Sequence, residues 1–363
     1  MDRNYQPLDI HRKVVEFIDS GSSFAVALIL KAEGSTPRKA GVKAIIEQTG
    51  NIWGTLGGGA VEAETQRRAV EACQLKRPIV FDFYLHGTSR KDDVPICGGT
   101  MRILIDPTVE KNRASYIQAA EAIQRRQRGV LLTTICTTAR TDVTLQWLPE
   151  QDVPSGPAFP GAGDIRSCLA REEPQLFTES SQKPDSFIEV LVEPVIPKPL
   201  LLIAGAGHIG QALALQAVLI GFDVVVMDDR PEFTNQALFP EGVTTLCGDI
   251  SKEMAAFPIA DDNYIVVVTH GHKLDAAALE ACIHSPAAYI GMIGSKRKVA
   301  LLRRNFIESG LATEEEFNRV FAPIGLDIGA VTVPEIATSI IAQLIAVRRK
   351  GRTHTPPGDM ELR

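Results

Sequence analysis

Hydrophobic and polar residues follow two different patterns along this chain of 363 residues. Beyond residue 199, short unbroken apolar runs alternate with segments of helical character. The apolar runs lie at 200–204, 223–227, 244–247, 264–269 and 288–290, and the main helical segments at 211–220, 274–283 and 295–309. Continuous apolar strands joined by helices are typical of a parallel sheet that is covered on both faces. This half therefore predicts a Rossmann-like, doubly wound α/β fold, closed by a helix to Arg348 that opens with a capping box of Thr332 and Glu335.

The first half is less regular. It shares short helices and strands that do not alternate strictly, with helices at 8–20, 60–74 and 113–126 and strands at 24–31, 42–47, 78–84, 100–105, 129–136 and 186–192. Such an order is typical of an α+β domain with a mixed sheet. The N-terminal half is therefore predicted to be a separate domain of that class.

Two changes in composition divide the chain. Residues 149–184 are rich in proline, glycine and serine, which predicts a long loop. Prolines at 194, 197 and 199 favour a stiff, extended connector. We therefore predict an N-terminal domain over 1–195 that contains the loop, a Rossmann-like domain over 196–351, and a C-terminal tail over 352–363.

Composition limits the function. The net charge of −6 does not favour nucleic-acid binding, no apolar run reaches membrane-spanning length, and the N-terminus lacks a signal-peptide core. We therefore expect a cytoplasmic protein with no nucleic-acid or membrane partner. The six cysteines are scattered without a C-x-x-C pair, so neither a disulfide framework nor a metal site is expected.

The segment after the first apolar run of the second half carries a glycine pattern of the dinucleotide-binding type. Gly205, Gly207 and Gly210 form G-x-G-x-x-G between a strand and a helix, and Asp228 ends the next strand. Gly205 permits a tight turn, Gly207 lets a phosphate approach, and Gly210 lets the helix pack closely. Asp228 could accept hydrogen bonds from a ribose. The pattern predicts a phosphoester ligand, and the alternative is a tight strand–helix turn that binds nothing.

Further candidate residues follow other predicted strands of this half. His208 lies inside the glycine turn, and His270 and His272 follow the fourth strand, where they could contact a cofactor or cap the next helix. Gly294 and Ser295 precede three basic residues in the first turn of a helix, which suggests an anion cradle, with a solvated basic turn as the alternative. A glycine-hinged loop at 322–329 carries one acid, and a structural role is equally compatible with it.

Three segments of the first half contain unusual glycines. Gly57, Gly58 and Gly59 precede a helix and could surround an anion or a planar ligand with backbone amides. A second segment is the turn 34–38. The third contains Cys97 before two further glycines, a setting suited to an exposed thiol, although free cysteine is ordinarily buried.

Taken together, these segments resemble the XdhC/CoxI family of accessory proteins for molybdenum enzymes such as xanthine dehydrogenase. The resemblance covers nearly the whole chain outside 149–184. The matching pieces are Gly34-Ser-Thr-Pro-Arg38, Gly57-Gly-Gly59-Ala-Val-Glu62, Cys97-Gly-Gly99, Gly205-Ala-Gly207-His208, Asp228-Asp-Arg230, Thr269-His270-Gly-His272 with Asp275, Gly291-Met-Ile-Gly294-Ser295 and Pro323-Ile-Gly325-Leu-Asp327.

The resemblance implies binding of the molybdenum cofactor (molybdopterin), protection of it while a cysteine desulfurase adds sulfur, and delivery to a xanthine dehydrogenase-type molybdenum hydroxylase. It also implies a homodimer that acts as a chaperone more than as an enzyme. Some family members carry cysteine at the position of Gly59, so a role built on that cysteine does not transfer, and Cys97 remains for thiol chemistry on the cofactor. The alternative, which the glycine pattern and Asp228 alone favour, is an NAD(P)-dependent oxidoreductase.

Overall fold

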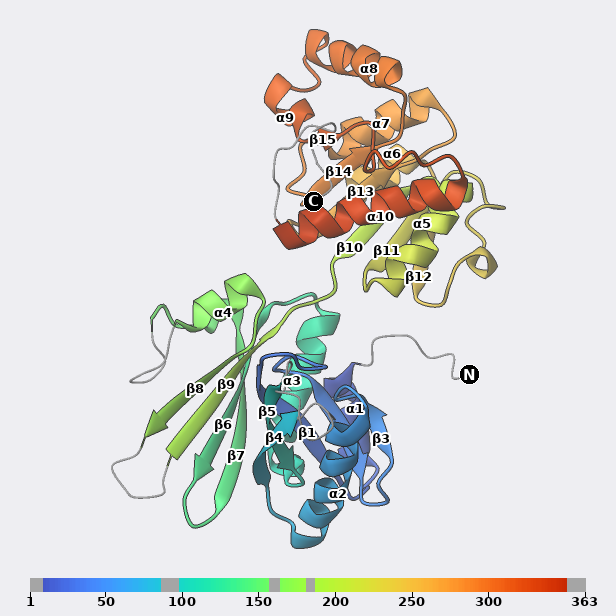
Figure 1. Ribbon diagram of the computed structural model, residues 1–363. Helices are drawn as coiled ribbons and strands as arrows, with labels where there is room; N and C mark the ends of the chain where they lie inside the picture. Colours follow the sequence, from blue (N-terminus) through green and yellow to red (C-terminus); the bar gives the residue numbers. More distant parts are fainter. Residues whose placement is uncertain (1–8, 86–97, 157–163, 181–186, 351–363) are drawn as a thin grey trace, which may run out of the picture. The chain divides into compact units, whose positions relative to one another are not determined.

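The computed structural model describes residues 9–85, 98–156, 164–180 and 187–350. The chain divides into two compact units between Pro197 and Lys198 (Figure 1). The prolines at 194, 197 and 199 lie at this division.

The N-terminal unit contains a five-stranded antiparallel sheet. Its order is β3 (Ile52–Gly54), β2 (Lys43–Glu47), β1 (Phe24–Glu33), β5 (Gly99–Asp106) and β4 (Ile79–Leu85). Residues of β1 are buried on both faces because α2 (Gly59–Leu75) packs on one face and α1 (Ile10–Asp19) with α3 (Arg113–Gln124) packs on the other. The short helix η1 (Val109–Asn112) leads into α3.

A second antiparallel sheet faces the first within this unit. Its order is β7 (Thr141–Pro149), β6 (Gly129–Thr137), β9 (Phe187–Val195) and β8 (Gln175–Ser180). Leu28, Leu30 and Leu104 of the first sheet pack against Ile135 and Leu191 of the second. Two buried ion pairs, Lys43 with Glu193 and Arg102 with Glu189, also join the sheets.

The prediction of one long loop over 149–184 is wrong for most of the described part of that segment. It contains η2 (Glu150–Asp152), α4 (Ile165–Arg171) and β8. Asp164 caps α4 through the backbone N–H of Arg166, and Ile165, Cys168 and Leu169 bury the helix against β9. A helix of seven residues between proline-rich stretches has too short a periodicity to be seen in the sequence.

The C-terminal unit is built on a six-stranded parallel sheet. Its order is β12 (Val243–Cys247), β11 (Asp223–Asp228), β10 (Leu200–Ala204), β13 (Asn263–Val267), β14 (Tyr289–Met292) and β15 (Val320–Phe321). The helices α5 (His208–Leu219) and α10 (Val333–Lys350) cover one face of this sheet. The helices α6 (Ile250–Ala256), α7 (His272–Cys282), α8 (Lys296–Glu308) and α9 (Glu314–Asn318) cover the other (Figure 1).

The predicted fold class is confirmed for both halves, and the predicted strands of the second half lie within three residues of those observed. Missing from the prediction were α6, α9, β15 and the short helix η3 (Gln236–Leu238). Strand order reverses between β10 and β13, so this is the topological switch point at which ligands of such sheets bind.

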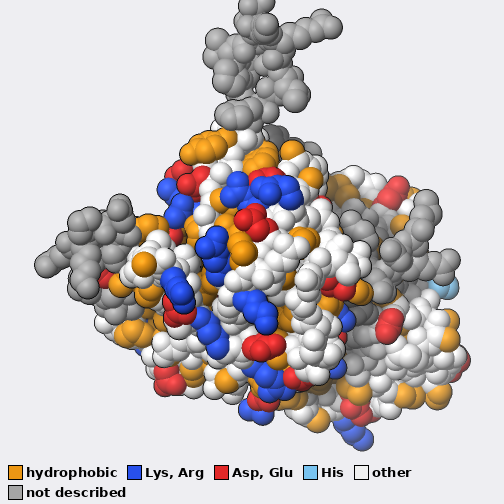
Figure 2. Space-filling view, turned by 90° about the horizontal axis from the view of Figure 1, so that it is seen from below, with side chains coloured by type: hydrophobic (Ala, Val, Ile, Leu, Met, Phe, Trp, Pro, Cys, Tyr) orange, Lys and Arg blue, Asp and Glu red, His pale blue; other side chains and the backbone are white. Residues whose placement is uncertain are grey.

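The described surface is mixed in charge. Acidic and basic side chains are interspersed over the face shown in Figure 2. No helix among the described residues is long and apolar enough to cross a membrane. Five cysteines fall within the described ranges, at 73, 136, 168, 247 and 282, and all five are free thiols.

Candidate functional site

The carboxyl edge of the parallel sheet brings most of the predicted residues together. The N–H of Gly205 donates to Met227 O at 2.8 Å, and the N–H of Val268 donates to Ala204 O at 2.8 Å. The N–H of Ile293 donates to Val267 O at 2.9 Å. These bonds set the ends of β11, β10, β13 and β14 side by side. The glycine turn, Asp228, His270 and Gly294 therefore lie along one edge.

Each glycine of the turn has a distinct steric role. Gly205 has φ +118°, and a Cβ there would lie 2.4 Å from the carbonyl oxygen of Val268. A Cβ on Gly210 would lie 2.0 Å from the carbonyl oxygen of Gly205. At Gly207 a Cβ would meet no atom within 4 Å, so its surface is open. Only Gly207 thus leaves space beside the backbone for a ligand.

Two helices begin at the switch point without a capping side chain. Gly207 is the N-cap of α5 and Gly271 is the N-cap of α7, and neither helix has a side-chain cap among the described residues. The first amides of a helix lack partners within the helix and carry partial positive charge. Since α5 follows β10 and α7 follows β13, both ends flank the switch point, where they can receive an anion.

Asp228 does not present a free carboxylate at this edge. Its side chain is fully buried and accepts hydrogen bonds from Ala206 N (2.7 Å) and from Arg230 N, Nε and Nη2 (3.1, 2.8 and 3.0 Å). Burial raises its pKa, but the bonds from Arg230 and Ala206 outweigh burial and lower the pKa overall. Asp228 therefore fastens the glycine turn to Arg230, and both oxygens that could read a ribose are already engaged.

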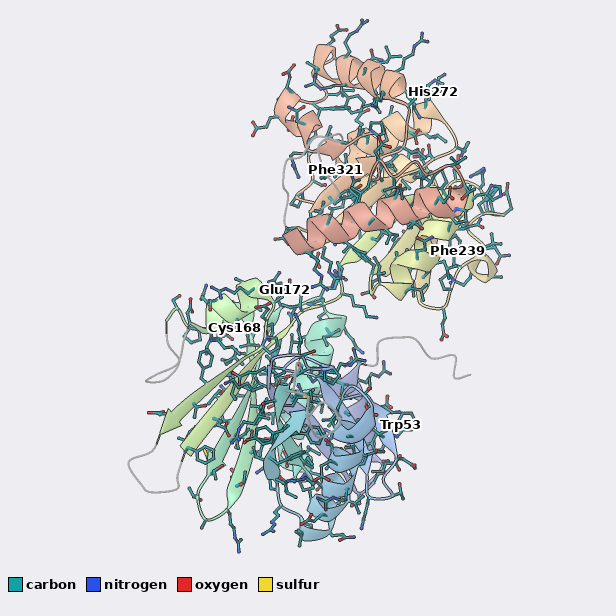
Figure 3. The ribbon with its side chains drawn as sticks, in the orientation of Figure 1. Trp53, Cys168, Glu172, Phe239, His272 and Phe321 are labelled. Atoms are coloured by element: carbon teal, nitrogen blue, oxygen red, sulfur yellow. The ribbon has the colours of Figure 1, made fainter. Side chains whose placement is uncertain are left out.

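The histidines of the edge are exposed. Nδ1 of His270 lies 4.0 Å from Oδ1 of Asp229, so a residue after β13 meets a residue after β11. Together with Asp228 these residues are the one group in the described part of the chain with metal-ligating atoms mutually within 4.8 Å. Arg230 already neutralises Asp228, which disfavours a cation there. His272, labelled in Figure 3, and His208 are the first residues of α7 and α5.

The predicted anion cradle at Gly294 and Ser295 has a structural explanation in part. The hydroxyl of Ser295 caps α8 by accepting from Lys298 N at 3.3 Å. The ammonium of Lys298 donates to the buried carboxylate of Asp275 at 2.5 Å, and Asp275 also accepts from the hydroxyl of Thr269 at 2.6 Å. Lys298 is therefore placed by an internal ion pair. Lys296 and Arg297 remain exposed beside it.

In the N-terminal unit the unusual glycine segments converge. A Cβ on Gly57 would lie 2.5 Å from the side chain of Pro37, and one on Gly34 would lie 2.8 Å from the carbonyl oxygen of Gly98. A Cβ on Gly99 would lie 2.5 Å from the carbonyl oxygen of Ser35. Segments 34–38, 57–59 and 98–99 thus pack backbone to backbone, and we call them the glycine cluster. Cys97 lies outside the described residues.

The amides beside Gly57–Gly59 are not free for an external anion. Oε1 of Glu62 accepts from Leu56 N (2.8 Å), Gly58 N (3.2 Å) and the hydroxyl of Thr55 (2.6 Å). Burial raises the pKa of Glu62, but these hydrogen bonds lower it overall. The anion cradle predicted here is therefore filled by the chain's own carboxylate. Gly58 and Gly59 still have open surfaces, with no atom within 4 Å of a built Cβ.

Sequence reasoning missed Arg230 and the Phe233 ring, whose centroid lies 3.9 Å from its guanidinium carbon. A signal existed, because an arginine two residues after a strand-ending acid can fold back to pair with it. The groove between α2 and β4 was also missed, since nothing in the sequence shows that these elements leave space between them.

The fold and the edge define a two-unit protein with a Rossmann-type ligand edge and an antiparallel N-terminal unit. The model of the XdhC Rossmann domain matches residues 201–344, and the model of the XdhC and CoxI family matches residues 17–83. The chain belongs to the XdhC and CoxI family.

Several known proteins are similar over most of this chain. The uncharacterized protein YqeB of Escherichia coli K12 is 26% identical over 346 residues, and the chain spans 46% of YqeB's length. A protein of Bacillus subtilis 168 named as a probable xanthine dehydrogenase component is 23% identical, and the molybdenum cofactor insertion chaperone PaoD of E. coli K12 is 24% identical. The match covers 94% of this chain in both cases, with 98% of the B. subtilis protein and 89% of PaoD.

A solved structure shares the fold. The crystal structure of a xanthine dehydrogenase from Bacillus halodurans has a TM-score of 0.71 and 23% sequence identity, and it covers 96% of this chain and 98% of that one.

Proposed function

We propose that this protein is an accessory protein for a xanthine dehydrogenase-type molybdenum hydroxylase. In this proposal it binds the molybdenum cofactor, protects it while a cysteine desulfurase adds sulfur, and delivers it to the hydroxylase. Family membership and the name of PaoD support the class of function. The observation that carries the proposal is the edge itself, where an open glycine turn accepts a phosphate while the ribose-reading acid is engaged.

The residues present fit a phosphoester ligand. The open surface at Gly207 and the uncapped amides of α5 and α7 would hold its phosphate, and His208, His270 and His272 stand beside them as further donors. When bound, the cofactor supplies the molybdenum and dithiolene chemistry that the hydroxylase later uses. The chain's own contribution is to bind, to orient and to exclude water.

The sulfur step is assigned to the N-terminal unit. We place Cys97 and Gly57–Gly59 at this step because Gly98 and Gly99, which follow Cys97, belong to the glycine cluster. The protein is further proposed to act in the cytoplasm as a homodimer. Size measurement in solution tests the dimer.

The competing function is an NAD(P)-dependent oxidoreductase, which the Rossmann-like sheet favours. The ion pair between Asp228 and Arg230 disfavours it, because a ribose would have to replace charge-assisted hydrogen bonds with neutral ones.

Ligand content separates the two functions. Protein purified from cells that make the molybdenum cofactor should yield pterin fluorescence after oxidative release, and it should not alter NADH fluorescence on titration. Co-expression with a molybdenum hydroxylase should raise the sulfurated fraction of that enzyme. NADH binding without any pterin would establish the oxidoreductase and overturn the proposal.

A further inference from the structure

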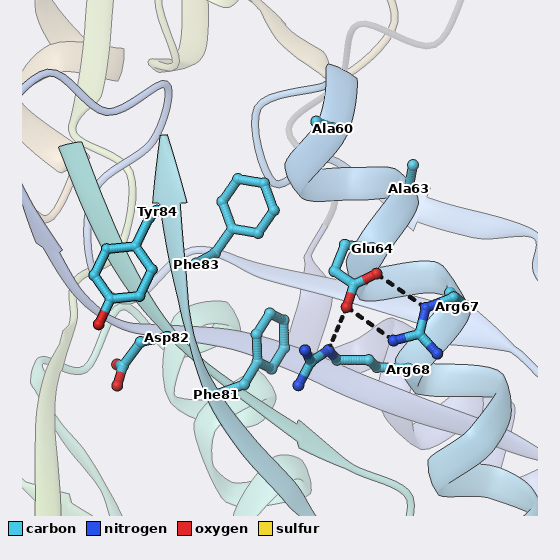
Figure 4. A pocket seen from close by; sticks show the side chains of 9 residues that line it. All are labelled: Ala60, Ala63, Glu64, Arg67, Arg68, Phe81, Asp82, Phe83 and Tyr84. Atoms are coloured by element: carbon cyan, nitrogen blue, oxygen red, sulfur yellow. Dashed lines mark hydrogen bonds and ion pairs between the residues drawn. The ribbon is translucent and has the colours of Figure 1, made fainter. Parts of the chain in front are cut away.

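A groove in the N-terminal unit lies between the first half of α2 and strand β4 (Figure 4). Its volume is about 580 Å³, within the range of small-molecule sites. The residues that line it are Ala60, Ala63, Glu64, Arg67, Arg68, Phe81, Asp82, Phe83 and Tyr84.

The groove exists because the helix carries small side chains opposite aromatic ones. Phe81 and Phe83 point from β4 toward α2, whereas Asp82 and Tyr84 point away (Figure 4). Phe81 is buried, but Phe83 is only half-buried, since Ala60 and Ala63 on the helix do not reach it. One face of an aromatic ring is thus left open beside apolar helix surface, which is suited to a planar ring.

One end of the groove carries a fixed positive charge. Glu64 accepts from Arg67 Nε and Nη2 at 2.9 Å each and from Arg68 Nε at 2.6 Å. These two arginines lower the pKa of Glu64 to about 2, so the carboxylate is ionised at any physiological pH. The guanidinium carbon of Arg68 also lies 4.1 Å from the ring centroid of Phe81. Two held guanidinium groups against one carboxylate leave a net positive end.

The other acid of the groove does not cancel this charge. Asp82 pairs with Arg102 at 3.0 Å, and Arg102 pairs in turn with Glu189 of the second sheet. The groove also adjoins the glycine cluster, because Ala60 directly follows Gly59 in the first turn of α2. It therefore combines an aromatic wall, a positive end and a neighbouring loop of open glycines.

We infer that this groove binds a planar heteroaromatic ring that carries an anionic substituent. The inference rests on the proposed function, under which the ring is the pterin of the molybdenum cofactor. The ring lies against Phe83 and the surface of Ala60 and Ala63, and the anionic group lies toward Arg67. Purine nucleotides share this chemistry, and competition by AMP separates them from pterins.

The test uses the full chain carrying Gly207→Val, which closes the open surface of the C-terminal glycine turn. Binding of neopterin phosphate is followed by its fluorescence anisotropy, and AMP is titrated as the competing ring. Ala63→Leu fills the groove at an exposed helix position where leucine is a good helix former, and Arg67→Gln removes one charge. Gln74→Leu and Arg77→Gln, exposed and outside the groove, are the matched controls.

Neopterin phosphate should bind, and each groove variant should weaken binding about tenfold, while the controls change it less than about twofold. Arg67→Gln should affect unphosphorylated neopterin less than its phosphate. The inference is overturned if neopterin phosphate does not bind, if AMP binds more tightly, or if both groove variants bind as the unsubstituted groove does while circular dichroism shows them folded.

Failure of the proposed function gives a different result. In that case the unsubstituted chain would carry no pterin from cells and would not raise hydroxylase sulfuration, whatever the groove binds. Conversely, a chain that carries the cofactor equally well with Ala63→Leu would retain the proposed function and lose the groove.

Discussion

Two glycines of one turn should respond to substitution in opposite ways. Gly207 has φ −66° and ψ −173°, a conformation open to any residue, and a Cβ there meets no atom within 4 Å. Valine is a poorer N-cap than glycine but restricts the unfolded chain, so Gly207→Val should change stability by less than about 1 kcal/mol. The variant should nevertheless lose phosphoester binding, because the side chain fills the space that the phosphate needs.

Gly210→Ala should instead damage the fold. The added Cβ would lie 2.0 Å from the carbonyl oxygen of Gly205, where real Cβ atoms stay beyond 3.0 Å. The obstacle is backbone, so helix α5 and the turn must separate. Overpacking of this kind costs about 3 kcal/mol.

Hydrogen exchange by mass spectrometry is the suitable assay, because both tryptophans, Trp53 and Trp147, lie in the N-terminal unit and do not report on this turn. Peptides of β10 and α5 should exchange roughly a hundredfold faster in Gly210→Ala and nearly unchanged in Gly207→Val. Cofactor content is measured on the same samples. Full cofactor retention by Gly207→Val, or normal exchange in Gly210→Ala, would refute the reasoning.

Three further outcomes are expected. Residues 197–351 expressed alone should fold, and a disordered circular dichroism spectrum would contradict the domain boundary. Because the pKa of Glu62 is lowered in the fold, its contribution is full above its ordinary value of 4.5 and is lost as the pH falls through the lower folded value; Glu62→Gln should cost about 1 kcal/mol at neutral pH and flatten this acid dependence in urea titrations. Cys97→Ser should stay folded yet fail to activate the hydroxylase, and full activation would remove the thiol from the mechanism.

The parallel sheet was predictable because its information is local. Each apolar run, turn and helix forms one βα unit, and the glycine pattern marks where the first unit turns. The N-terminal unit depends on pairing between distant segments. Strand β8 was missed because it lies in a proline-rich stretch, and only its pairing with β9 identifies it.

The candidate site was predicted in its backbone and not in its side-chain partners. The roles of Gly205 and Gly210 follow from the motif, and the structure gives each a steric reason. The partner of Asp228 does not follow, since the same acid can face a ribose or an arginine. The amides near Gly58 likewise serve Glu62, a residue that the sequence placed only as a neighbour.

The pairing of Asp228 decides which part of a ligand the edge can recognise. Freeing its carboxylate would break three bonds from Arg230 at a fully buried position, and two ribose hydroxyls would return only neutral hydrogen bonds. Leaving a buried charge without its partner costs several kcal/mol. The phosphate position, in contrast, requires no rearrangement, because Gly207 is open and the amides of α5 have no side-chain cap. An edge of this kind favours a phosphoester whose remaining contacts are not those of a nicotinamide dinucleotide, and a phosphorylated pterin meets that requirement.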